Sequence, residues 1–179
     1  MMSIYHRMFT AREVIAAADI SMSTLQNWLK RNVIVGHKTI EGGGERGKHR
    51  RFSWYNVMEI CAAAALVRAG VSDLGLAFAA GMKFGHNNPQ ARTRAPQRAI
   101  AMPYETSHGG TLLIAAGNRS NVVCHKIGAD PITAVRAELG QPEAFIIIDL
   151  LQMFGRACAA LNLNPQAILI EAYAEERDD

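Results

Sequence analysis

The spacing of apolar and polar residues predicts short helices at the start of the chain. Thr10 and Glu13 are spaced as a capping box, in which each side chain accepts a hydrogen bond from the other residue's backbone. Phe9 and Val14 flank this box at the positions of a hydrophobic staple. The pattern predicts a helix that begins after Thr10 and ends near residues 18–19.

A second helix is predicted over residues 23–31, capped by Ser23 or Ser21. Leu25, Trp28 and Leu29 recur on one face, which we expect to be buried. The opposite face carries side chains that hydrogen-bond base edges or phosphates: Thr24, Gln26, Asn27, Lys30 and Arg31. Two short helices in succession, the second with such a face, are typical of a helix-turn-helix.

An apolar and then alternating segment, residues 33–40, predicts a strand, and residues 48–52 predict a second one. The glycine-rich segment 41–47 between them tolerates the backbone angles of a turn. We therefore expect a hairpin, or wing, whose cations bind phosphates. These cations are Lys38, Arg46, Lys48, His49, Arg50 and Arg51.

The sequence GGGERGK within this hairpin also matches most of a phosphate-binding loop, at Gly42, Gly47 and Lys48. The hydroxyl that would bind magnesium is replaced by His49, a poor ligand for this oxygen-preferring ion. The cations that follow also oppose the dipole of the helix that such a loop should open. We interpret the glycines as a hairpin tip, and a nucleotide-binding protein or enzyme is the weaker alternative.

Two further helices are predicted over residues 54–68 and 73–84, with Ser53 as the first cap and Ser72 or Asp73 as the second. Gly70 is placed to end the first of them in a left-handed conformation. Both helices are rich in alanine, so we expect them to pack closely against each other.

The rest of the chain predicts a polar linker and then a mixed part. Residues 85–98 contain two prolines and no apolar period, which indicates a linker; Arg92, Arg94 and Arg98 are either phosphate contacts or solvated cations. Strands are predicted at 100–104, 111–116, 121–127 and 144–148. Helices are predicted from Asp130-Pro131 to about residue 139, over residues 149–161 with Asp149 and Gln152 as a cap pair, and from residue 165 onward. A single helix over 143–162 is the alternative to the last strand and its helix.

The net charge of +3 conceals two halves of opposite sign. Residues 1–98 contain 14 Lys or Arg against 6 Asp or Glu, and residues 99–179 contain 5 against 10. A basic half next to an acidic half favours a polyanion-binding part followed by a separate part.

These elements together resemble the MerR family of winged-helix DNA-binding proteins over about residues 8–84. The resemblance rests on Phe9-Thr10, Ser23-Thr24-Leu25, Asn27-Trp28-Leu29-Lys30-Arg31, Arg50-Arg51-Phe52-Ser53 and Ala69-Gly70-Val71-Ser72. It implies sequence-specific binding of duplex DNA as a dimer, with the second helix in the major groove and the wing on the backbone. Gln26-Asn27-Trp28 departs from the family's usual Arg-Tyr-aromatic pattern, and no long coiled-coil helix follows residue 84.

The three cysteines, Cys61, Cys124 and Cys158, are too few and too widely spaced for a disulfide framework or a paired zinc site. Cys124, His125 and His108 are the residues that would suggest catalysis, but a cysteine in a strand is typically a packed core residue. We therefore expect no enzyme activity, cofactor or metal. The absence of an apolar span or signal peptide leads us to expect a cytoplasmic protein with no membrane partner.

We predict an α+β protein: a winged helix-turn-helix domain (1–84), a linker (85–98) and a small α/β domain (99–179) for dimerisation or effector binding. The predicted function is sequence-specific binding of double-stranded DNA by a homodimeric transcriptional regulator, a repressor rather than an activator. An effector of unknown identity is left open. An excisionase-like architectural DNA factor is the alternative. Besides the residues named above for the second helix and the hairpin, Ser23 and Tyr55 complete the predicted DNA-binding set.

Overall fold

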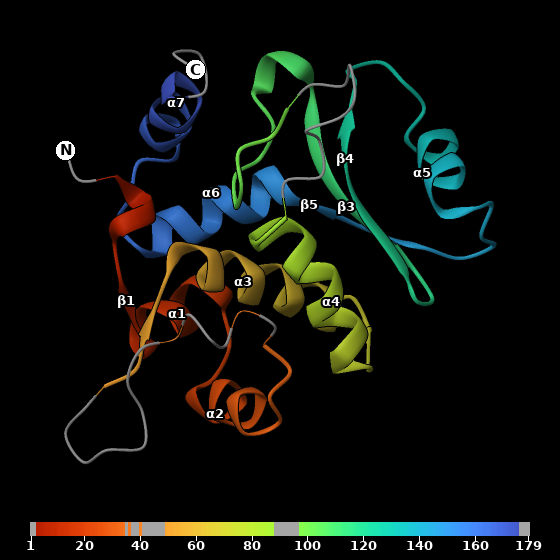
Figure 1. The fold of residues 1–179 in the computed structure, drawn as a ribbon. Coiled ribbons are helices and arrows are strands. Elements are labelled where there is room, and N and C mark those ends of the chain that lie inside the picture. The colour runs from red at the N-terminus through yellow and green to blue at the C-terminus, as the bar shows by residue number, and fades with distance from the viewer. Residues whose placement is uncertain (1–2, 35, 37–39, 41–48, 88–96, 176–179) are drawn as a thin grey trace.

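The computed structural model describes residues 3–34, 36, 40, 49–87 and 97–175. Over these residues the fold is mixed α+β, with seven α-helices and two small antiparallel sheets (Figure 1). The GGGERGK segment lies outside the described residues, as do Arg92 and Arg94 of the predicted linker.

The first two predicted helices are present. In α1 (Ala11–Ala18) the capping box is complete: Thr10 N donates to the Glu13 carboxylate at 2.7 Å, and Glu13 N donates to Thr10 Oγ1 at 3.3 Å. The helix ends at Asp19, whose φ of 54° is left-handed. Ser21, and not Ser23, caps α2 (Met22–Lys30), because its Oγ accepts a hydrogen bond from Thr24 N at 3.0 Å.

Helix α3 (Trp54–Arg68) lies at the centre of the molecule (Figure 1). Residues 56–64 are all buried, so the helix has no solvent-facing stripe along this stretch. Ser53 caps it as predicted, Gly70 follows its end with a φ of +103°, and Asp73 caps the next helix, α4 (Leu74–Gly85).

Two glycines bring α4 against the backbone of α3. A Cβ atom on Gly81 would lie 2.6 Å from the carbonyl oxygen of Glu59, and one on Gly85 would lie 2.8 Å from that of Tyr55. Both distances are shorter than carbon and oxygen allow, so the close packing predicted from alanine-rich faces depends on glycine at these two positions.

The second sheet has the strand order β4-β3-β5 and is antiparallel throughout. Its strands are β3 (Gly110–Ala116), β4 (Arg119–His125) and β5 (Ile146–Asp149). Helices α5 (Pro131–Leu139), α6 (Leu150–Ala160) and α7 (Pro165–Glu175) complete this half. Because β5 pairs with β3, the alternative of one helix over 143–162 is wrong.

The sheet separates two layers of helices. Leu113 and Val122 face the main core, which includes α3, α4 and α6, whereas Ile114 faces α5 and packs with Val135 and Leu139. Strand residues alternate between the two faces, as the pleat requires.

The N-terminal and C-terminal halves share the main core. Trp54 of α3 packs edge-on against Phe154 of α6, with ring centroids 5.9 Å apart. The Arg156 side chain in α6 donates to the carbonyl of Ala17 near the end of α1 at 3.2 Å. Apolar burial is therefore continuous from α1 to α6.

The predicted strand over residues 100–104 is wrong. These residues form turns, and Ala101 has a left-handed φ of 60°. Their backbone groups are paired outside any ladder: Ala101 N donates to Phe84 O at 3.1 Å, and Tyr104 N donates to Thr111 Oγ1 at 2.7 Å. The apolar side chains in this segment are buried by tertiary packing and not by a sheet.

The predicted wing is also different in its described part. Of the expected first strand, residues 33, 34, 36 and 40 are described and are not in a strand. The second strand is reduced to β2 (Arg51–Phe52), which pairs with β1 (Phe9–Thr10) at the start of the chain. This strand thus pairs along one edge with a segment about forty residues earlier, while most of the predicted hairpin partner, residues 35, 37–39 and 41–48, lies outside the described part of the chain.

Both ends of the predicted linker belong to the folded core. Gly85 is the last residue of α4, and Arg98 is fully buried. The Arg98 guanidinium donates to the carbonyls of Phe84, Met102 and Asn87 at 3.2, 2.9 and 2.7 Å. It thereby satisfies carbonyls at the C-terminal end of α4, where a cation is favoured, and it is not a phosphate contact.

We predict that Gly81→Ala lowers the free energy of unfolding by about 1–3 kcal/mol, because the added methyl group pushes α4 away from α3. Gly155→Ala in α6 is the matched control, since a Cβ atom there meets nothing within 4 Å. The control should raise stability by up to about 1 kcal/mol through helix propensity alone. Urea unfolding of both variants measures the difference, and equal stability changes would contradict the close contact.

Candidate nucleic-acid interface

Helix α2 presents its predicted recognition face to solvent. Ser23, Gln26, Asn27, Lys30 and the C-capping Arg31 are exposed, and Thr24 is half-buried. The Ser21 hydroxyl hydrogen-bonds the hydroxyls of Ser23 and Thr24, each at 2.8 Å, in the first turn, which orders the start of this face. The structure thus brings the six predicted α2 residues together on one accessible surface.

The opposite face of α2 is held by the core. Leu25 and Trp28 are buried, and the Trp28 ring meets Phe78 of α4 edge-on with centroids 5.1 Å apart. After the helix, Asn32 adopts a left-handed φ of 52° and Val33 N donates to Trp28 O at 3.4 Å. Because α4 is packed on α3 through glycines, Trp28 ties the orientation of α2 to the most closely packed part of the molecule.

A cationic segment precedes α3 at the same end of the molecule as α2 (Figure 1). His49, Arg50 and Arg51 are exposed, whereas Phe52 and Trp54 are fully buried. The pairing of Arg51 with Thr10 in the β1–β2 ladder fixes where the segment joins the core. The remaining predicted wing cations, Lys38, Arg46 and Lys48, lie outside the described residues.

The charge in this region is strongly positive. Residues 20–58 contain seven Lys or Arg and two Asp or Glu. Both acidic residues, Glu41 and Glu45, lie outside the described residues, whereas α2 itself and residues 49–51 contain cations and no Asp or Glu. Such a surface attracts a polyanion and releases its counterions.

A buried polar network holds the segment that follows α2, and sequence reasoning missed it. Gly36 N donates to the Glu59 carboxylate at 3.2 Å, while Asn56 Nδ2 donates to Gly36 O at 2.9 Å. The same Glu59 carboxylate pairs with His86 Nε2 at 2.8 Å. A Cβ atom on Gly36 would lie 2.5 Å from the Asn56 and His86 side chains, so only glycine fits there. Gly36, near the start of the predicted wing, is therefore held in place by the core.

Tyr55 has a packing role beside this network. Its ring stacks on Tyr5 with centroids 5.5 Å apart and lies 6.1 Å from the His86 ring. Burial raises the pKa of the Tyr55 phenol, which therefore stays neutral at physiological pH. A DNA contact from Tyr55 remains a prediction.

The cysteine and histidines of the C-terminal half do not form an activated nucleophile. Cys124 Sγ donates to the backbone carbonyl of His108 at 3.4 Å, and burial raises the pKa of this thiol. His125 is the next strand residue and so points to the opposite face. Among the described residues, no group of three or more His, Cys, Asp or Glu is placed to hold a metal ion. No helix in the described part of the chain is long and apolar enough to cross a membrane.

We predict slow alkylation of all three cysteines by iodoacetamide near neutral pH, because thiolate is scarce when the thiol pKa is raised. Burial raises the pKa of Cys61 and of Cys158 to about 12, so these two should stay unmodified until urea unfolds the protein. Cys124 should react more slowly than free cysteine but before the other two. Peptide mass spectrometry measures each rate, and a Cys124 faster than free cysteine would indicate an activated thiolate.

A scan of the sequence against protein-family models found no match, and a search of the curated proteins found none. The MerR-like arrangement of α1, α2 and the wing therefore stays an expectation from the sequence.

Proposed function

We propose that this protein is a transcriptional regulator that binds double-stranded DNA through α2 and the cations of residues 49–51. The observation that supports this most is the division of α2 into two faces. Its polar, donor-rich face is exposed, while Trp28 and Leu25 hold the other face rigidly against the core. A rigid helix that presents several hydrogen-bonding side chains is what base readout requires.

The residue types on α2 suit the major groove. Amide side chains such as Gln26 and Asn27 pair with the N6 and N7 edge of adenine, and Lys30 or Arg31 with the acceptors of guanine or with phosphate. The major groove is wide enough to admit an α-helix. In this proposal the four side chains supply sequence specificity.

Arg50 and Arg51 supply affinity. Both are exposed, and the fully buried Phe52 next to them anchors the segment. Phosphate contacts position a protein on the duplex without reading its sequence. In this proposal the protein acts as a homodimer on a two-fold site, because helix-turn-helix regulators read two half-sites about one helical turn apart. Repression by occupying a promoter is the regulatory mode we favour.

We predict that the double variant Arg50→Ala/Arg51→Ala weakens binding to all duplex sequences alike. The slope of log affinity against log salt should flatten by about two units, since about two phosphate contacts are lost. Fluorescence anisotropy with a mixed-sequence duplex at several salt concentrations measures it.

The matched control removes two exposed cations elsewhere, Lys126→Ala/Arg136→Ala, which lie in and before α5. It changes the net charge equally and should leave the slope close to that of the unmodified protein. Equal slopes for all three proteins would refute the assignment of Arg50 and Arg51 to the DNA backbone.

Replacing the two amides, Gln26→Ala/Asn27→Ala, should instead relax specificity. Each lost bidentate contact costs about 1–3 kcal/mol on the preferred sequence and little on others. The measurement is affinity for a selected site and for a scrambled site at one salt concentration, with Gln166→Ala in α7 as the exposed-amide control. A uniform loss on both sites would contradict base readout by these residues.

A further inference from the structure

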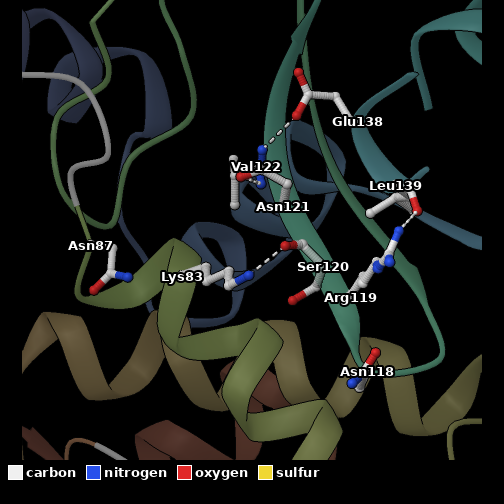
Figure 2. Close-up of a pocket in the computed structure, with 9 residues that line it drawn as sticks. All are labelled: Lys83, Asn87, Asn118, Arg119, Ser120, Asn121, Val122, Glu138 and Leu139. Carbon is white, nitrogen blue, oxygen red and sulfur yellow. Dashed lines mark hydrogen bonds between the residues drawn. The ribbon is translucent and has the colours of Figure 1, made fainter. Parts of the chain in front are cut away.

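A polar cavity of about 450 Å³ lies between the end of α4, the β3–β4 hairpin and α5. Figure 2 shows the side chains that enter it from these three elements. Its polar lining includes Lys83, Asn87, Asn118, Arg119, Asn121 and Glu138. The volume falls in the range of small-molecule sites, about 300–1,000 Å³.

The lining offers more hydrogen-bond donors than acceptors. Lys83 Nζ donates to the carbonyl of Ser120 at 2.5 Å, and Arg119 Nη1 donates to the carbonyl of Leu139 at 2.9 Å (Figure 2). Within the described part of the chain, Lys83 and Arg119 make no other side-chain hydrogen bond. An ammonium has three donors and a guanidinium has five, so most of their N–H groups remain for a ligand. The exposed amides of Asn87 and Asn118 add to these donors.

The two cations are held in place by the fold. Arg119 bonds the last turn of α5, and Gly140, with a left-handed φ of 78°, leaves room for it: a Cβ atom on Gly140 would lie 2.2 Å from Arg119 Nη1. Lys83 joins α4 to the backbone of the edge strand β4. The cavity therefore has a prearranged positive wall, and preorganised donors lower the cost of binding.

The cavity also has one acidic side chain. The Glu138 carboxylate accepts a hydrogen bond from Asn121 Nδ2 at 2.9 Å, and the side-chain oxygen of the same amide, Asn121 Oδ1, accepts one from Val122 N at 2.9 Å. A carboxylate has about four acceptor positions, so Glu138 can also accept from a ligand hydroxyl. The cation donors and this single acceptor together define the chemistry of the ligand.

We propose that this cavity binds a small, hydroxyl-bearing molecule through its phosphate or carboxylate group. The oxyanion lies against Lys83 and Arg119, with the amides of Asn87 and Asn118 beside it, and the hydroxyl faces Glu138. Charge-assisted hydrogen bonds of this kind are about twice as strong as neutral ones.

The site is connected to α2 through one helix. Lys83 and Phe78 both belong to α4, and Phe78 packs against Trp28 of α2. A ligand that bridges Lys83 and Arg119 stabilises one position of α4 against the sheet, and that position sets the orientation of α2. This coupling to DNA rests on the proposed function, whereas ligand binding itself does not.

The test of binding is a titration of the ¹⁵N-labelled protein, in the absence of DNA, with inorganic phosphate, acetate and glycerol phosphate at constant ionic strength. Backbone amide shifts of Lys83, Arg119, Ser120 and Asn121 should saturate with phosphate or with acetate, which distinguishes the two oxyanions. Glycerol phosphate should bind more tightly than phosphate if the hydroxyl reaches Glu138.

Lys83→Gln should weaken binding about tenfold, the loss expected for one charge-assisted contact. Lys126→Gln, an exposed lysine outside the cavity, should change nothing. Should Lys83→Gln fail to fold, Asn118→Ala in the exposed hairpin turn replaces it with a smaller expected loss. Shifts that never saturate, that saturate with unchanged affinity in Lys83→Gln or Asn118→Ala, or that saturate at α2 and residues 49–51 instead would overturn the proposal.

Coupling is measured separately, as the duplex affinity with and without glycerol phosphate. We expect a change in affinity that disappears in Lys83→Gln, at matched ionic strength. A protein that binds glycerol phosphate at the cavity but no DNA would refute the proposed function and leave the ligand site intact. A protein that binds DNA but shows no saturable shifts at the cavity would refute the ligand site alone.

Discussion

The close contact between α3 and α4 is the constraint on which the rest of the structure depends. Gly81 and Gly85 remove the side chains that would hold the two backbones apart, and α3 can then be buried on all sides along residues 56–64. Helices α1, α4 and α6 all pack against this buried helix. Close packing of this kind tolerates little displacement, so elements attached to α4 inherit its position.

Two attached elements matter for function. Trp28 sets α2 on α4, and the network of Glu59, His86 and Asn56 fixes Gly36 on the end of both helices. The cations of residues 49–51 join the same core through the β1–β2 ladder. A rigid scaffold with exposed polar side chains at one end is the usual arrangement of a recognition surface. The polar cavity lies at the C-terminal end of α4, where Lys83 follows Phe78 by five residues, so a ligand there would act on the same helix.

Local chemistry made much of the fold predictable. The capping box at Thr10 and Glu13, and the caps at Ser53, Asp73, Asp130 and Asp149, depend on residues three or four apart and were found in place. The failures came from distant partners. The sequence predicted a strand at residues 100–104, but backbone groups of this segment hydrogen-bond Phe84 and Thr111 instead. It predicted a phosphate contact or a solvated cation at Arg98, but this side chain bonds a carbonyl at the end of α4. The exposed face of α2 was predicted from the helical period of the sequence alone. The cavity could not be predicted in this way, because its lining comes from α4, β4 and α5, which are distant in sequence.

Selection of bound sequences from a random pool of duplex DNA tests the central claim most directly. We expect an enriched two-fold motif, with half-sites about one helical turn apart. Tandem direct repeats would favour an architectural factor over a promoter regulator. Salt-sensitive binding without any motif would contradict base readout by α2, and no binding at any salt concentration would contradict the proposed function itself.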